Sequence, residues 1–86
     1  MDVANLIRMA NRIGAFFEAM PDHAEAVNGI VQHLRRFWEP RMRVALLDFL
    51  EQHPDGCQGE ICLMPLVREA VAQHADELRP AAARAT

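Results

Sequence analysis

The sequence predicts an all-α fold, arranged as a small single-domain bundle of about four helices. Apolar residues recur at steps of three and four along most of the chain, which is the spacing of helices with one buried face. No stretch alternates apolar and polar residues as a half-buried strand would. A chain of 86 residues has room for one core. We assign residues 1–79 to the helical domain and expect residues 80–86 to form a frayed tail.

The first helix is expected over residues 3–20, just before Pro21. Its apolar stripe consists of Val3, Leu6, Ile7, Ala10, Ile13, Gly14 and Phe17. A second apolar edge is formed by Met9, Phe16 and Met20. Such an edge indicates that the helix either lies between two neighbours or exposes apolar area to a partner.

The second helix is expected over residues 23–38 and the third over residues 41–52. Asp22 is suited to cap the second helix, and Glu25 is favoured in its first turn by the helix dipole. Pro40 ends this helix because it lacks a backbone donor, and it suits the first turn of the next one. The apolar side of the second helix carries Val27, Ile30, Val31, Leu34, Phe37 and Trp38, and that of the third carries Met42, Ala45, Leu46, Phe49 and Leu50.

Residues 53–60 contain the proline, aspartate and glycines of a turn-rich loop. Helical spacing then returns and predicts a last helix over residues 64–78, with Pro65 in its first turn and Pro80 after its end. From the four helices together we expect a common core that includes Ile13, Phe17, Ile30, Leu34, Leu46, Phe49, Leu50 and Val67.

The composition argues against several classes of protein. The formal net charge is −3 and every positive side chain is an arginine. An acidic chain without a lysine-rich arm is not typical of a nucleic-acid-binding protein. No apolar run approaches the roughly 20 residues of a membrane span, and the first residues lack a signal-peptide pattern. We therefore expect a cytoplasmic protein without membrane contact, in which Cys57 and Cys62 are reduced, dispensable thiols.

The sequence contains no recognisable catalytic or cofactor motif. A phosphate-binding glycine loop, a nucleophile elbow and a metalloprotease helix are all missing. The acid–base pairs to consider are His23 with Glu25 and His33 with Asp48, but nothing in the sequence brings either pair into a pocket. A zinc site would need four ligands whose spacing differs from the tight Cys-x2-Cys knuckle, namely His53, Cys57, Cys62 and His74. We predict no catalytic residue, no metal site and no cofactor.

The segment of residues 34–43 reads Leu-Arg-Arg-Phe-Trp-Glu-Pro-Arg-Met-Arg and surrounds the only tryptophan with four arginines. Arginine and tryptophan often dominate protein interfaces, because guanidinium groups form forked hydrogen bonds and tryptophan supplies a large rigid contact area. The alternative is that the tryptophan belongs to the core and the arginines are solvated. We predict a protein–protein interface that uses Arg35, Arg36, Phe37, Trp38, Arg41, Arg43, Met9 and Phe16.

Three stretches together resemble the delta subunit of the cytoplasmic, molybdenum-containing, NAD-dependent formate dehydrogenases. They are Leu6-Ile7-Arg8-Met9-Ala10-Asn11-Arg12-Ile13 with Phe16-Phe17, His33-Leu34-Arg35-Arg36-Phe37-Trp38-Glu39-Pro40-Arg41-Met42-Arg43, and Pro65-Leu66-Val67-Arg68-Glu69-Ala70. The likeness covers most of residues 3–72, and its central stretch is the most specific part. Residues 53–62 depart from the family pattern, which is shorter, glycine-rich and without cysteines, so no family function extends to Cys57 or Cys62.

The resemblance implies a non-catalytic accessory subunit that carries no cofactor itself. Its partners would be the other formate dehydrogenase subunits: a large molybdopterin and iron–sulfur subunit, a flavin subunit that handles NAD, and a further iron–sulfur subunit. We expect the large molybdenum subunit to be the one contacted, in a role that stabilises or helps assemble the complex. The alternatives are a small helical nucleic-acid-binding or regulatory module and, less favoured, a zinc or redox mini-domain. Self-association of the isolated chain stays open.

Overall fold

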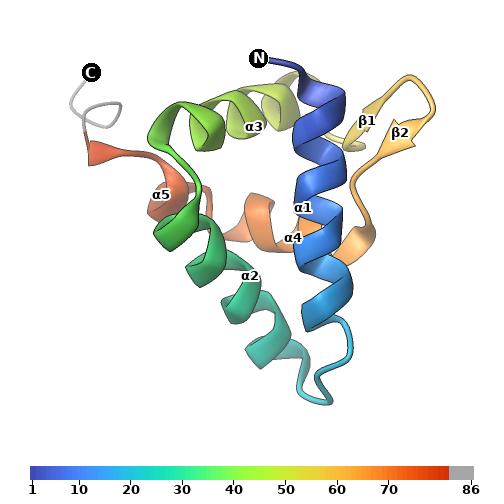
Figure 1. The fold of residues 1–86 in the computed structure, drawn as a ribbon, viewed down its shortest axis with the longest axis vertical. Helices are drawn as coiled ribbons and strands as arrows, with labels where there is room; N and C mark the ends of the chain where they lie inside the picture. The colour runs from blue at the N-terminus through green and yellow to red at the C-terminus, as the bar shows by residue number, and fades with distance from the viewer. Residues whose placement is uncertain (82–86) are drawn as a thin grey trace.

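The computed structural model describes residues 1–81, which form five helices and one short hairpin (Figure 1). Helix α1 spans Val3–Phe17 and helix α2 spans His23–Phe37. Both begin at an aspartate, because its carboxylate accepts amide hydrogen bonds that the first turn leaves unpaired. Asp2 accepts from the N–H of Ala4 at 3.0 Å, and Asp22 accepts from that of Ala24 at 2.9 Å. The predicted cap of the second helix is therefore confirmed.

Prolines begin the next helices. Helix α3 spans Pro40–Gln52 and helix α4 spans Pro65–Gln73, each with proline at its first position, where no backbone donor is needed. Helix α5 follows directly as a single turn, Ala75–Leu78. The predicted last helix is thus divided at His74, whose φ of −115° and ψ of 28° leave the helical range for one residue. The predicted tail falls largely on residues 82–86, which lie outside the described part of the chain.

The prediction of a purely helical chain is wrong at residues 57–62. There, strand β1 (Cys57–Gln58) pairs antiparallel with strand β2 (Ile61–Cys62), so that Cys57 faces Cys62. The connection is Gly59–Glu60, with a φ of 62° at the glycine only. A positive φ at the first of two hairpin residues is typical of a type II′ turn, and glycine adopts it without strain. Strands of two residues are too short to show the alternation from which strands are predicted.

The expectation of reduced cysteines is also wrong for this structure, because Cys57 and Cys62 form a disulfide. The hairpin register explains the pairing: it brings their Cα atoms to 4.0 Å from each other. A further backbone bond, from the N–H of Leu63 to the carbonyl of Gly56 at 2.8 Å, continues the hairpin on its open side. The disulfide therefore closes a loop that is already held by hydrogen bonds.

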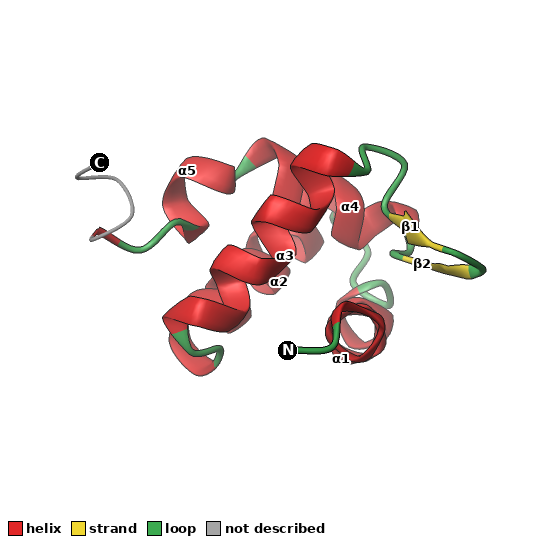
Figure 2. Cartoon of the chain, turned by 90° about the horizontal axis from the view of Figure 1, so that it is seen from above, coloured by secondary structure: helices red, strands yellow, loops and turns green. Residues whose placement is uncertain are grey.

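The core lies between the helices, and every helix contributes to it. Helix α2 packs against α1 and α4, and α1 also contacts α3 and α4. Figure 2 looks down the axis of α1 and shows the remaining helices to one side of it. Six of the eight predicted core residues are buried, whereas Ile13 and Phe17 are half-buried at its edge. Among residues 1–81, no helix is both long and apolar enough to cross a membrane.

Asn11 connects α1 to the segment between β2 and α4. Its amide nitrogen donates to the carbonyl of Cys62 at 2.9 Å, and its amide oxygen accepts from the N–H of Met64 at 2.9 Å. The side chain thus satisfies one donor and one acceptor of an extended backbone, as a neighbouring strand would. This pair of bonds fixes where α4 begins relative to α1.

Two glycines allow close helix contacts. At Gly14 of α1, an added Cβ would lie 2.4 Å from Cγ2 of Val67 and 2.6 Å from Sδ of Met64. At Gly29 of α2, it would lie 2.4 Å from the ring of Phe17. At both glycines an added Cβ would be too close to its neighbours for a real contact, so the helices can approach this closely only because glycine has no side chain.

The two glycines should respond differently to the same substitution. Replacing glycine by alanine favours the helical conformation by up to about 1 kcal/mol at either site. The difference in stability between the two variants therefore measures the effect of packing. We expect Gly14→Ala to lower the free energy of unfolding by about 1 to 2 kcal/mol, because Val67 is fully buried and has no room to move. Gly29→Ala should be nearly neutral, because the half-exposed ring of Phe17 can turn away. Urea denaturation of both variants measures this, and equal losses would contradict the packing argument.

Removing the disulfide should lower stability moderately. A loop this short contributes about 2 kcal/mol in the chain-entropy view, because the cross-link restricts the unfolded chain. We expect the Cys57→Ser, Cys62→Ser double variant to have the same free energy of unfolding as the wild type has when urea denaturation is carried out in a reducing buffer. A wild type whose urea midpoint is identical in oxidising and reducing buffers would show that the cross-link contributes nothing.

Candidate partner interface

Four rings form a continuous row across α1 and α2. The rings of Phe16 and Phe17 meet edge to face with centroids 5.0 Å apart, Phe17 lies 6.5 Å from the His33 ring, and His33 lies 4.8 Å from Phe37. The two ends of this aromatic row are in solvent, with Phe16 exposed by 74% and Phe37 by 69%. Large exposed aromatics that adjoin one another are characteristic of contact surfaces.

A hollow of about 420 Å³ lies beside the aromatic row. It is lined by Arg12, Ile13, Phe16, Phe17 and His33, so its walls are mostly apolar and carry one permanent positive charge. The hollow follows from the fold: Ile13 and Phe17 stand at the edge of the core where α1 and α2 meet, and Gly29 lets Phe17 lie close to α2. The predicted second apolar edge of α1 is confirmed at Phe16.

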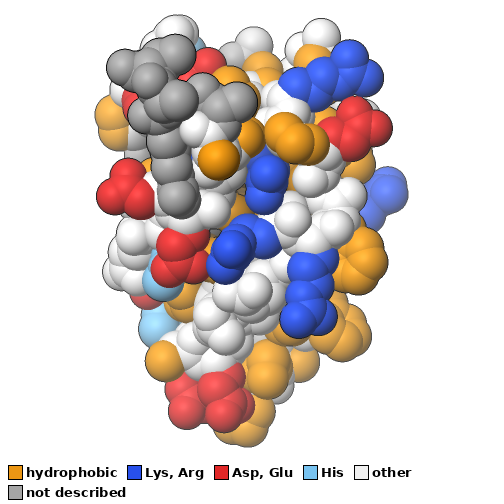
Figure 3. All heavy atoms as spheres, turned by 90° about the vertical axis from the view of Figure 1, so that its left-hand side faces the viewer, with side chains coloured by type: hydrophobic (Ala, Val, Ile, Leu, Met, Phe, Trp, Pro, Cys, Tyr) orange, Lys and Arg blue, Asp and Glu red, His pale blue; other side chains and the backbone are white. Residues whose placement is uncertain are grey.

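The arginines near the end of α2 are exposed but separate into two directions. Helix geometry turns successive side chains by about 100°, so Arg36 lies on the same side of α2 as His33, three residues earlier, while Arg35 points elsewhere. Arg35 lies 3.9 Å from the carboxylate of Glu77 on α5, and Arg41 lies 3.3 Å from that of Glu39. Figure 3 shows the face that α2 and α5 share, where arginine side chains run beside hydrophobic ones. Both ion pairs are solvent-exposed and contribute little to stability.

Two residues of the predicted interface are not free surface. Trp38 is only 6% exposed and belongs to the core, as its place on the apolar side of the second helix predicted, whereas Phe37, predicted on the same side, is exposed instead. The reason is that α2 ends at Phe37 and the extended backbone of Trp38 (φ −84°, ψ 135°) takes its side chain off the helical face. Met9 is half-buried against the core and lies outside the aromatic row.

Arg43 has a structural contact within the chain. Its Nη1 donates to the carbonyl of Arg35 at 3.4 Å, which caps a carbonyl in the last turn of α2. Its Nε is buried, and within the described part of the chain it has no hydrogen-bond partner. Arg43 therefore joins the end of α2 to α3 and offers less to a partner than its sequence position indicated.

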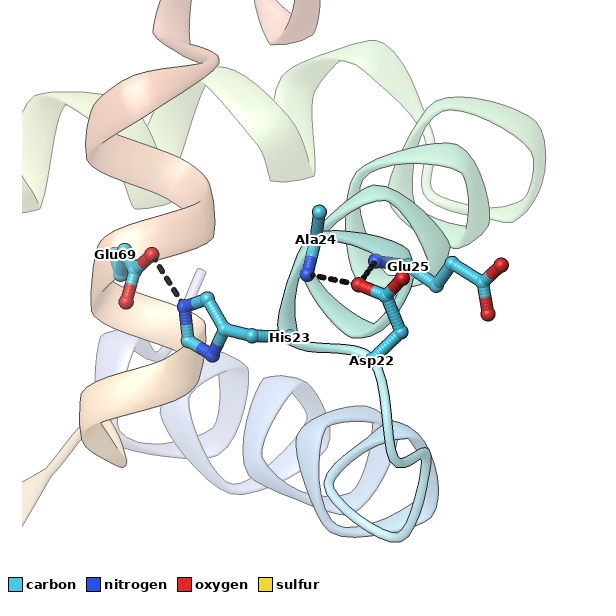
Figure 4. Close-up of polar contacts among 5 residues, drawn as sticks. All are labelled: Asp22, His23, Ala24, Glu25 and Glu69. Carbon is cyan, nitrogen blue, oxygen red and sulfur yellow. Dashed lines mark hydrogen bonds and ion pairs between the residues drawn. The ribbon is translucent and has the colours of Figure 1, made fainter.

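A second hollow, of about 370 Å³, lies on another face, between the start of α2 and α4. Figure 4 shows its main polar contact, in which Nε2 of His23 lies 2.7 Å from Oε2 of Glu69. His23 therefore pairs with Glu69 on α4 and not with Glu25, the partner considered from the sequence. Because His23 is mostly exposed, the contact is a surface bridge between two helices.

The four potential zinc ligands are engaged elsewhere. The two cysteines are bonded to each other, His53 stacks on Phe49 with centroids 5.1 Å apart, and Nδ1 of His74 lies 3.1 Å from the carboxylate of Glu77. Within residues 1–81, no group of three or more histidine, cysteine, aspartate or glutamate side chains is placed to hold a metal ion.

The neighbours Phe37 and Trp38 should differ sharply in their contribution to stability. Trp38→Ala should lower the free energy of unfolding by about 3 to 5 kcal/mol, because it removes a buried ring. Phe37→Ala should change it by less than about 0.5 kcal/mol, because its ring is already in water. Urea denaturation of the isolated chain measures both values. Similar losses for the two variants would mean that the end of α2 is placed differently.

Comparison with known protein families gives a match over most of the chain. The family described as the NADH-dependant formate dehydrogenase delta subunit, FdsD, matches residues 5–71, well over half of the chain. The matched segment includes most of α1 and α4 and all of α2, α3 and the hairpin, and therefore all four rings of the aromatic row. No significant match was found among curated proteins or among solved structures.

Proposed function

The chain belongs to the formate dehydrogenase delta-subunit family, and we propose that it is a non-catalytic accessory subunit that binds and stabilises a formate dehydrogenase complex, or helps to assemble it. The proposed location is the cytoplasm, and the proposed partner is the large molybdenum subunit. The chain would bring no cofactor and no catalytic group of its own. Its contribution would be a contact surface.

The exposed aromatic row is the observation that carries this proposal. Phe16 and Phe37 each leave more than two thirds of their surface in water, although the chain has a core that could have taken apolar side chains. Burying such rings in a partner removes apolar area from water at about 25 cal/mol per Å² before the costs of association. Aromatic residues and arginine are the types that most often dominate such contacts.

The proposed interface joins the aromatic row to the exposed arginines of the α2–α3 corner. Phe16 and Phe37 supply apolar contact, and Arg35, Arg36 and Arg41 supply donors for partner carboxylates. Trp38 and Arg43 support this surface from beneath, the first from the core and the second by holding the end of α2. Met9 would contribute only the part of its side chain that remains exposed.

The test is co-purification from the native host, with molybdenum as the readout of the partner. We expect the Phe16→Ser, Phe37→Ser double variant to lose association by about 30-fold or more, equivalent to about 2 kcal/mol, while its own thermal midpoint stays within a few degrees. The Arg36→Ala, Arg41→Ala double variant should also weaken association without lowering the midpoint.

The control is Leu66→Ser, which alters the other hollow, the one beside His23 and Glu69. It should leave association intact once any change in stability is taken into account. The proposal fails if the aromatic double variant co-purifies with molybdenum at the wild-type yield. It also fails if the wild type binds DNA or RNA in a salt-sensitive manner and brings down no formate dehydrogenase subunit, which would favour the nucleic-acid alternative.

A further inference from the structure

The arginines of this chain differ in whether they have a partner within it. Of those in residues 1–81, five contact another group of the chain: Arg35, Arg41, Arg43, Arg68 and Arg79. The other three, Arg8, Arg12 and Arg36, have no hydrogen bond or ion pair with any described residue. The three therefore keep their full capacity to bind anionic groups.

Two of these three arginines, Arg12 and Arg36, adjoin residues of the aromatic row. Arg12 lines the hollow, Arg8 lies one turn before it on α1, and Arg36 lies three residues after His33 on α2. In contrast, Arg68 near the start of α4 donates to the carbonyl of Asp55, and Arg79, just after α5, pairs with carboxylates of α3. Arg12 of α1 thus lines the apolar hollow itself, and Arg36 of α2 follows the His33 of its wall by one helical turn.

From this arrangement we infer the chemistry of the segment that docks here: a partner segment that inserts one apolar side chain into the hollow and carries carboxylates that pair with Arg12 and Arg36. This inference rests on the proposed function and specifies which part of the surface selects the partner. The hollow is open and is walled by the exposed Phe16 of α1 and by His33 of α2, so it suits a chain segment lying across these two helices better than an enclosed small molecule.

The arginines and the apolar wall play different parts in this docking. The apolar side chain gains by leaving water, whereas a carboxylate that pairs with a guanidinium beside the desolvated rings gains a charge-assisted, forked hydrogen bond. A partner segment without acidic residues would leave Arg12 partly desolvated and unpaired, which costs free energy. The hollow therefore favours acidic over basic segments of equal hydrophobicity.

The first test measures association of the full chain with the formate dehydrogenase subunits over a range of salt concentration. We expect Arg12→Gln, Arg36→Gln to weaken association about tenfold or more at low salt and to reduce its dependence on salt. Arg12→Lys should keep most of the salt dependence, because it keeps the charge but loses the forked hydrogen bond. The matched control is Arg68→Gln, which removes an arginine near the hairpin and should leave association unchanged.

The second test identifies the docked segment. A photo-crosslinking phenylalanine analogue at position 13, in the wall of the hollow, should capture a partner peptide with an apolar residue and an aspartate or glutamate within about one helical turn. A captured peptide that lacks acidic residues, or that comes from a second copy of this chain, overturns the inference.

The inference and the proposed function can fail separately. The first case is that the Phe16→Ser, Phe37→Ser double variant loses the complex, whereas the Arg12→Gln, Arg36→Gln double variant associates like the wild type at every salt concentration. The accessory function then stands, and the acidic-segment inference is wrong. If the aromatic variant also associates normally, the proposed function itself is wrong. An equal loss for Arg68→Gln overturns the inference too, because the effect would then not belong to the hollow.

Discussion

The contact between α1 and residues 62–67 is the constraint on which the rest of this structure depends. Asn11 holds the backbone at Cys62 and Met64 through two 2.9 Å hydrogen bonds, and Gly14 lets Val67 approach α1 more closely than any side chain would allow. Together they fix where α4 starts and at what distance it packs. The hairpin before α4 and the core behind it take their places from this contact, since Val67, Ala70 and Val71 of α4 are all fully buried.

The same contact determines what α1 shows to solvent. Side chains follow one another at about 100° around a helix, so a helix that turns Asn11 and Gly14 toward α4 must turn Phe16 to the opposite side. Phe17, one position further, lies between these directions, and Gly29 gives its ring room against α2. The exposed aromatic row is thus a geometric consequence of how α1 is held.

The charged side chains near this surface influence which partner segments it favours. Exposed ion pairs such as that between Arg79 and Glu51 hold chain segments together only weakly. Three arginines, Arg35, Arg41 and Arg79, have a carboxylate partner of this kind, whereas Arg12 and Arg36, which adjoin the aromatic row, have none among the described residues. In a chain with a net charge of −3, these unpaired positive side chains favour acidic partner segments over basic ones.

By itself, the sequence determined the parts of this protein that depend on local periodicity and on the chemistry of single residues. The steps of three and four predicted the helices, Asp22 and the prolines predicted their starts, and the specific stretch around Trp38 pointed to the family that the comparison then matched. These signals lie within a few neighbouring positions, so they can be read without knowing which segments meet.

Only the tertiary structure decided the features that require distant residues to meet. It paired Cys57 with Cys62 across a hairpin whose two-residue strands are too short to show alternation, it buried Trp38 while exposing Phe37, and it divided the arginines into paired and unpaired groups. The spacing of Arg12 with Phe16 and of His33 with Phe37, one turn apart on each helix, was present in the sequence. That the two pairs form one surface follows from how closely α1 and α2 pack, and the distance between two helices is set by side chains far apart in the chain.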